Sequence, residues 1–230
     1  MEKMKHNYGS EFQLLRFLGY HRSELEESIL KNTNINPKSS YKMVWLERKL
    51  NGEYEGIDFL PKSIQTKISK DWKAYWPQRG NAQNWDAVIH CLPASQNANL
   101  KEKWIIVEAK AHLQELKSNS GAKDIKSIEK INEAFNLTKQ QFGIDVKINW
   151  LKDYYQLANR LAFINFMRNN GIECSLLNIY FINGWPVESN KNVATKNDWK
   201  KAIDDEYQYL GVNSQAKKYI SEIFIDCKGQ

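Results

Sequence analysis

The 230-residue chain is long enough to bury one hydrophobic core, and no stretch rich in Pro, Gly or Ser divides it, which predicts a single domain over residues 1–230. Its formal net charge of +6 favours a polyanionic partner. The three cysteines lack a CxxC spacing, which argues against a disulfide framework and a zinc site. No run of eighteen apolar residues is present, so we expect no membrane span and a cytoplasmic location.

A helix is predicted over about residues 10–30, because the apolar residues of this stretch recur at helical spacing. Ser10 is suited to cap its N-terminus. Glu11 falls in the first turn, where the helix macrodipole favours an acidic residue whatever its other role. A polar loop is expected to follow over residues 31–40.

The region before residue 61 is ambiguous, because the segments 41–50 and 54–60 each fit a strand or a helical turn. We interpret the acidic residues among positions 53–58 as a solvated face, with a further metal ligand as the alternative. A short helix is then predicted over about residues 61–72, since its initial proline suits the first turn of a helix.

Aromatic and basic residues alternate over residues 71–81. Clustered aromatic side chains are usually buried, so we expect Trp72 and Trp76 in the core. Lys73 and Arg79 are suited to neutralise phosphate groups, as basic residues among aromatic ones often do in nucleic-acid-binding proteins. Both are therefore candidate nucleic-acid-binding residues.

Two predicted strands, residues 84–90 and 103–112, carry charges in otherwise apolar runs. Residues two apart in a strand share a face, so Glu108 and Lys110 point together, and Asp86 faces them if the strands pair in that register. Charges on a buried sheet face need a partner, a metal or a shifted pKa. Two close carboxylates suit Mg²⁺, which takes oxygen ligands, and a nearby lysine can stabilise charge developing on a phosphate.

Asp86, followed by Glu108-Ala109-Lys110 at the end of an apolar strand, resembles the active site of the PD-(D/E)XK nucleases, the restriction-endonuclease-like superfamily. The resemblance implies an α/β fold with an αβββαβ core, in which helices flank a mixed central sheet. It also implies phosphodiester hydrolysis that depends on Mg²⁺, with Mn²⁺ as a substitute. Asp86 and Glu108 are then metal ligands and Lys110 is the catalytic cation. Trp85 replaces the proline of the family name, which is the loosest element of the pattern.

The tripeptide Glu-x-Lys is common by chance, and it recurs here at residues 47–49 and 115–117. Glu108 differs from these because a continuous apolar run precedes it and because an aspartate lies on the predicted strand upstream. The alternative interpretation is a Glu–Lys pair on the solvent face of an edge strand. Apolar residues on both faces of the segment 104–107 favour a central strand instead.

Two more residues join the candidate site. His112 follows Lys110 by two positions, so it would share the same strand face. In many members of the superfamily an acidic residue on the first helix reaches the metal site, which makes Glu11 a candidate by resemblance.

The second half of the chain supplies the remaining elements. In order, they are helices over about residues 124–141 and 147–170, a strand over 176–182, a helix over 196–210 and a strand near 222–227. Gln156, Asn159 and Arg160 fall on one flank of the second helix and are further candidates for the site. The lysines of the first helix form either a phosphate-facing side or a solvated face.

Two functions fit these expectations. The first is a Mg²⁺-dependent nuclease acting on nucleic acid, DNA before RNA. The second is a catalytically silent module of the same fold that binds nucleic acid or a protein partner, since a fold does not fix a function. The intact set of Asp86, Glu108 and Lys110 favours the nuclease. A homodimer is compatible with the sequence but does not follow from it.

Overall fold

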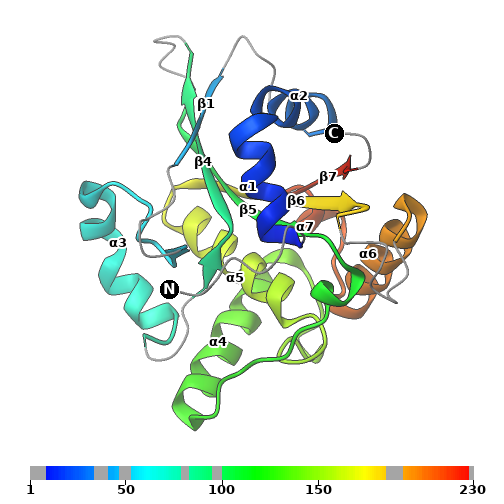
Figure 1. Ribbon diagram of the computed structural model, residues 1–230. Coiled ribbons are helices and arrows are strands. Elements are labelled where there is room, and N and C mark those ends of the chain that lie inside the picture. Colours follow the sequence, from blue (N-terminus) through cyan, green and yellow to red (C-terminus); the bar gives the residue numbers. More distant parts are fainter. Residues whose placement is uncertain are drawn as a thin grey trace.

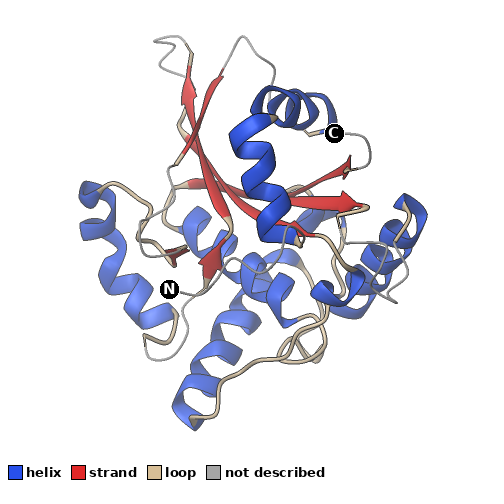
Figure 2. Cartoon of the chain, in the orientation of Figure 1, coloured by secondary structure: helices blue, strands red, loops and turns tan. Residues whose placement is uncertain are grey.

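The structure is a computed structural model, and it describes residues 9–33, 41–46, 53–78, 83–94, 100–184 and 194–227. Over these residues the chain is an α/β protein in which helices cover both faces of a curled, mixed five-stranded sheet (Figures 1 and 2). The predicted α/β class and the mixed sheet flanked by helices are confirmed. In the part of the chain that the structure describes, no helix is long and apolar enough to span a membrane.

The five-stranded sheet has the order β1-β4-β5-β6-β7. Its strands are β1 (Tyr41–Trp45), β4 (Ala87–Pro93), β5 (Lys103–Lys110), β6 (Glu173–Ile182) and β7 (Ile220–Asp226). The strands β1, β4 and β5 form an antiparallel meander, and β6 and β7 then join parallel to β5. The central position of β5 removes the edge-strand alternative for its Glu–Lys pair.

The predicted pairing of the two charged strands is confirmed, because Ala87 lies opposite Val107 in an antiparallel ladder. The upstream strand begins later than predicted, at Ala87, because the chain breaks at Asp86, and it continues to Pro93. The residues before the break, β3 (Asn84–Trp85), pair instead with β2 (Tyr54–Glu55) in a separate two-stranded sheet. The chain bends at Asp86 because the strands on either side belong to different sheets.

One face of the five-stranded sheet is covered by α1 (Ser10–Tyr20) and α2 (Arg22–Asn32). The prediction of one helix over residues 10–30 was wrong, because His21 leaves the helical conformation (φ −127°, ψ 29°) and ends α1. The break lets each helix bury its own apolar residues: α1 contacts β5, whereas α2 contacts β7. Gly9 precedes the first helical turn, so Ser10 is not the N-cap.

The other face carries the larger hydrophobic core. The elements that follow β2 in the chain and build this side are α3 (Lys62–Tyr75), the 3-10 helix η1 (Leu113–Leu116), α4 (Ile125–Phe142), α5 (Tyr155–Asn169), α6 (Lys196–Leu210) and α7 (Ser214–Lys217). Trp72 and Trp76 stack within this core, as predicted. Glycines end α4 and α6 in the left-handed conformation, with φ of 64° at Gly143 and 69° at Gly211.

The helix predicted over residues 147–170 begins only at Tyr155. The preceding segment is folded into turns, because the side chains of Asp145 and Asn149 accept hydrogen bonds from backbone N–H groups two residues further on. Ser118 then fixes the start of α5, since its backbone N–H donates to Asp153 and its hydroxyl accepts from the Gln156 N–H. Local side-chain hydrogen bonds thus replace the first two turns of the predicted helix.

Candidate functional site

The candidate site lies on the face of β5 that packs against α5. On this face the buried Trp104 and Ile106 are followed by Glu108 and Lys110, whose exposed fractions are only 5% and 8%. The prediction that the two charged side chains share a strand face is confirmed, since Lys110 Nζ donates to Glu108 Oε1 at 2.6 Å. Two opposite charges are therefore buried side by side in the middle of the sheet.

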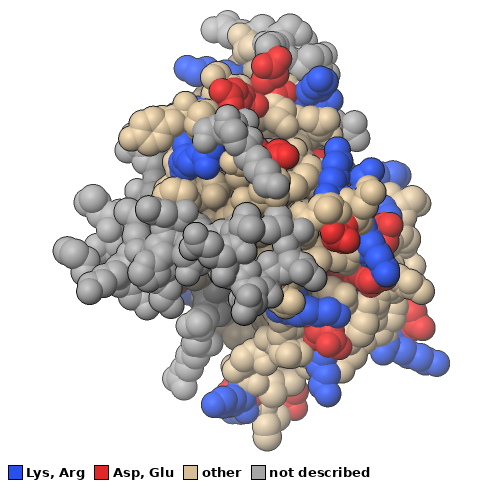
Figure 3. Space-filling model, turned by 45° about the vertical axis from the view of Figure 1, so that its right-hand side comes forward, with Lys and Arg blue, Asp and Glu red and all other residues tan. Residues whose placement is uncertain are grey.

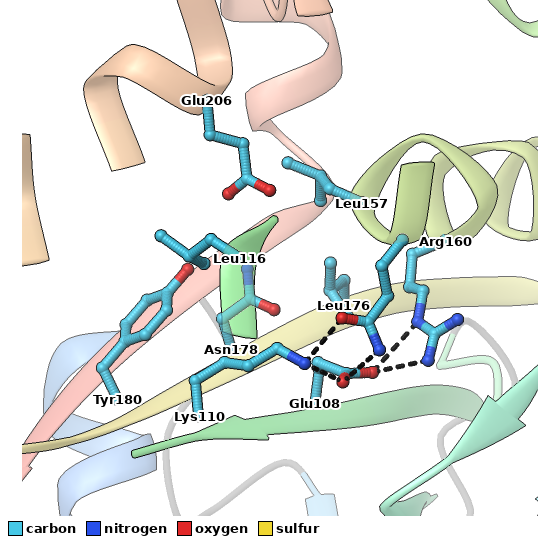
Figure 4. A pocket seen from close by; sticks show the side chains of 10 residues that line it. Glu108, Lys110, Leu116, Leu157, Arg160, Leu176, Asn178, Tyr180 and Glu206 are labelled. Carbon is cyan, nitrogen blue, oxygen red and sulfur yellow. Dashed lines mark hydrogen bonds and ion pairs between the residues drawn. The ribbon is translucent and has the colours of Figure 1, made fainter. Parts of the chain in front are cut away.

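Glu108 is the centre of a hydrogen-bond network (Figure 4). Its Oε1 atom accepts from Lys110 and also from Gln156 Nε2 at 2.8 Å. Its Oε2 atom accepts from Arg160 twice, from Nε at 3.0 Å and from Nη2 at 2.7 Å. Four donors therefore fill the roughly four acceptor positions that a carboxylate offers.

The network fixes the charge of Glu108. Burial alone would raise the pKa of this carboxyl, but the positive charges of Arg160 and Lys110 and their hydrogen bonds outweigh burial and hold the pKa below its usual value. Glu108 is thus ionised and paired with two cations. Such a network is stable only while all of its members are present.

The predicted flank of α5 forms the other half of the network. Gln156 bridges it, because its Oε1 atom accepts from Lys110 Nζ at 2.6 Å while its Nε2 atom donates to Glu108. Arg160 is held by Asn159 Oδ1 at 2.7 Å and by the Asn84 carbonyl at 2.8 Å. The structure therefore brings all three predicted residues of this helix to the site.

Asp86 approaches the site from the bend before β4. It lies one step before the pairing of Ala87 with Val107, level with Glu108, and its Oδ2 atom accepts from the Ala109 N–H at 2.7 Å. Burial and then the negative charge of Glu108 raise the pKa of Asp86 to about 7, although Lys110 opposes this shift. Asp86 in the bend and Glu108 on β5 therefore repel each other when both are ionised.

A cavity of about 20 Å³ adjoins the network, which is room for one water molecule. Its polar lining includes Glu108, Lys110 and Gln156, and it also includes Asn178 of β6 and Glu206 of α6. Figure 4 shows the carboxyl group of Glu206 pointing from α6 toward this space. The small volume fits a water or an ion.

Sequence reasoning missed Glu206, although a signal for it exists. The buried residues of α6 around it are Trp199, Ile203, Tyr207 and Leu210. Glu206 lies on this buried stripe, with an exposed fraction of 3%. An acidic residue on the apolar side of an amphipathic helix marks a buried charge that needs an explanation.

The remaining predicted residues do not line the cavity. Glu11 is exposed on α1, which covers the opposite sheet face, and the neighbouring Ser10 donates to Glu115 in η1. His112 accepts from the Gln114 N–H and caps η1. Lys73 is exposed on α3, and Arg79 lies outside the described residues.

The lysines of α4 do not form one phosphate-facing side. Lys126 is exposed, but Lys139 is buried and donates to the carbonyl groups of Val146 and Ile148 at 2.8 and 2.9 Å. Burial lowers the pKa of Lys139. On the face drawn in Figure 3, basic and acidic side chains are interspersed, so the net charge is not gathered into one basic patch there.

No family model matches the chain, and no curated protein or solved structure is significantly similar to it. Across the described ranges, no group of three or more His, Cys, Asp or Glu side chains is arranged to hold a metal ion. The functional argument therefore depends on the geometry and chemistry of Asp86, Glu108 and Lys110 themselves.

Proposed function

We propose that this protein is a Mg²⁺-dependent nuclease that hydrolyses phosphodiester bonds of nucleic acid, with DNA before RNA as its substrate. The observation that carries the proposal is the position of Asp86, in the bend before β4, level with Glu108 of β5. Glu108 in turn is paired with the buried ammonium group of Lys110. A cation relieves the repulsion between two ionised carboxylates, and an ammonium group nearby can stabilise the phosphate.

The order of the elements supports a PD-(D/E)XK assignment within this proposal. The helix α1 precedes the antiparallel meander β1, β4 and β5, and α5 then leads to β6, which is parallel to β5. This succession follows the αβββαβ order that the resemblance of the active-site residues implies. The insertions and the additional strand β7 lie outside that core.

The donor chemistry of the site fits Mg²⁺. Asp86 and Glu108 would hold the ion, and Mg²⁺ in enzymes is commonly bound by one or two carboxylates, with waters and substrate phosphates completing its shell. Asn84, two residues before Asp86, has a buried Oδ1 atom with no hydrogen-bond partner among the described residues, and its backbone carbonyl accepts from Arg160 Nη2. Bound Mg²⁺ would supply an activated water and stabilise charge on the phosphate.

The protein's own residues have separate tasks in this scheme. Arg160 keeps hold of Glu108 Oε2 through two hydrogen bonds, so the carboxylate stays oriented when its other oxygen changes partner. Gln156 orients Lys110. The Lys110 ammonium group then interacts with charge that grows on the scissile phosphate in the transition state.

Asp86→Asn is expected to lose most of its Mg²⁺ affinity while keeping the fold. The amide removes the negative charge that attracts the ion, yet its oxygen can still accept from the Ala109 N–H. Calorimetric titration with Mg²⁺ checks this, with Glu129→Gln as the control because Glu129 is an exposed acid on α4. Equal Mg²⁺ affinity of Asp86→Asn and wild type would refute Asp86 as a ligand.

One observation favours the second candidate function, a catalytically silent binding module. All acceptor positions of Glu108 are filled by side chains of the protein, an arrangement that also suits a purely structural ion-pair network. The Mg²⁺ titration separates the two, because a structural network gains nothing from the ion. Wild-type protein that binds nucleic acid but not Mg²⁺ would favour the silent module.

A further inference from the structure

Glu206 has a buried carboxyl group that has no task in the proposed nuclease function. None of the hydrogen bonds among the described residues involves its side chain, although its exposed fraction is only 3%. It lines the same small cavity as Glu108 and Lys110 (Figure 4). Burial disfavours the charged form of this carboxyl group, so its position beside the site needs a physical explanation.

Lys110 is the strongest attractive charge that acts on Glu206. Burial raises the pKa of Glu206 to about 8, and Lys110 is the first group that opposes this rise, with a smaller contribution from Lys117. The charges of Glu222 and Glu108 add to the increase. Lys110 is therefore the larger of the two positive charges that favour the ionised form of Glu206, and Tyr180 also lines the cavity.

Lys110 has the capacity for another acceptor. Its ammonium group carries three N–H donors, of which two are directed to Glu108 Oε1 and Gln156 Oε1. Lysine is a point charge on a flexible stem, unlike the planar, two-bond contact that Arg160 makes with Glu108. Lys110 therefore gives up one hydrogen bond when it leaves Glu108, whereas Arg160 would give up two.

A cation that binds Glu108 must displace a donor, because all four acceptor positions are filled. Repulsion between two positive charges favours the departure of Lys110. Its ammonium group has to remain paired, since the surroundings are buried. The adjoining cavity has room for a group the size of a water, and Glu206 is the other carboxylate among the residues that line it.

We propose that Glu206 is a positioning residue that receives the Lys110 ammonium group when a divalent cation binds between Asp86 and Glu108. This inference rests on the proposed function, because it requires the cation. Lys110 then has two acidic partners: Glu108 holds it in the cation-free protein, and Glu206, which is ionised by the approach of the ammonium group, holds it when Glu108 is engaged. The hydrogen bond of Lys110 to Gln156 limits how far it moves.

The test is a calorimetric titration of Mg²⁺ into wild-type protein, Glu206→Gln, Lys110→Met and the double variant. We expect Glu206→Gln to bind Mg²⁺ roughly tenfold more weakly, because the displaced ammonium group loses a charged partner. In the Lys110→Met background the same substitution should have almost no effect, since no ammonium group has to move. Glu206→Asp, which keeps the charge, should bind Mg²⁺ more tightly than Glu206→Gln.

Glu26→Gln is the matched control. Glu26 is a half-buried acid on α2, on the opposite face of the sheet, where it accepts from Trp45 Nε1 at 3.0 Å, and it does not line the cavity. Its replacement should leave Mg²⁺ affinity unchanged. Thermal melts verify that each variant is folded, and if Glu206→Gln does not fold, Glu206→Asp is compared with wild type in both backgrounds.

The outcomes separate this inference from the proposed function. If wild type and Glu206→Gln bind Mg²⁺ equally well, the role of Glu206 is overturned and the Mg²⁺ site is left intact. The same holds if Glu206→Gln lowers Mg²⁺ affinity equally in the wild-type and Lys110→Met backgrounds. Absence of Mg²⁺ binding by the wild type would overturn both. A loss that appears only when Lys110 is present is the expected result.

Discussion

Lys110→Met should cleave nucleic acid at least on the order of 100-fold more slowly than the wild type under single-turnover conditions. The physical reason is that the Lys110 ammonium acts on charge that grows in the transition state, so its loss affects the rate more than the binding of substrate. Mg²⁺ affinity should be retained or raised, because the ammonium group competes with the ion for Glu108. Methionine preserves the length and most of the volume of the buried side chain.

Lys126→Met is the control for this experiment, since Lys126 is an exposed lysine on α4 and should leave the single-turnover rate unchanged. The rates are measured at saturating Mg²⁺ so that affinity does not enter. If Lys110 only neutralises Glu108, its removal would lower the melting temperature and leave the rate unchanged. That result would refute the catalytic role of Lys110.

The second large effect concerns stability: Arg160→Met should lower the free energy of unfolding by about 3–5 kcal/mol. Arg160 makes two of the four hydrogen bonds to the buried Glu108, and it also binds Asn159 and the Asn84 carbonyl. Its removal leaves a buried carboxylate with Lys110 as the remaining cation. Denaturant unfolding of wild type and variant measures the difference.

Arg168→Met provides a matched comparison on the same helix. Arg168 pairs with Glu173 at 2.7 Å, but the two side chains are 30% and 40% exposed. An exposed pair of this kind contributes about 0–1 kcal/mol. If Arg160→Met and Arg168→Met lower the free energy of unfolding equally, the buried Glu108 network contributes no more to stability than an exposed ion pair.

The sequence predicted the elements that carry strong local signals. The helices α4 and α6 have clear apolar periodicity and a glycine at the end, and both lie within about a residue of the predicted bounds. The two charged strands pair as expected, and period two alone placed Glu108 beside Lys110. These features are local, so a single sequence contains them.

The features that the sequence did not predict depend on tertiary contacts. The helix break at His21 and the late start of α5 depend on which strands and loops each segment meets. Gln156 and Arg160 were expected on one flank, but their bonds to Glu108 require the packing of α5 on β5. Glu206 reaches the cavity because α6 packs against η1, a tertiary contact that the local sequence does not show.

The most direct test of the central claim is a cleavage assay on plasmid, linear duplex, single-stranded DNA and RNA, with Mg²⁺ and with a chelator. The wild type should cleave at least one of these substrates with Mg²⁺ and none with the chelator, and Asp86→Asn should be inactive at the same concentration. Cleavage that persists in Asp86→Asn, or wild-type protein that binds Mg²⁺ and nucleic acid yet cleaves no substrate, would contradict the proposal that Asp86, Glu108 and Lys110 form a nuclease site.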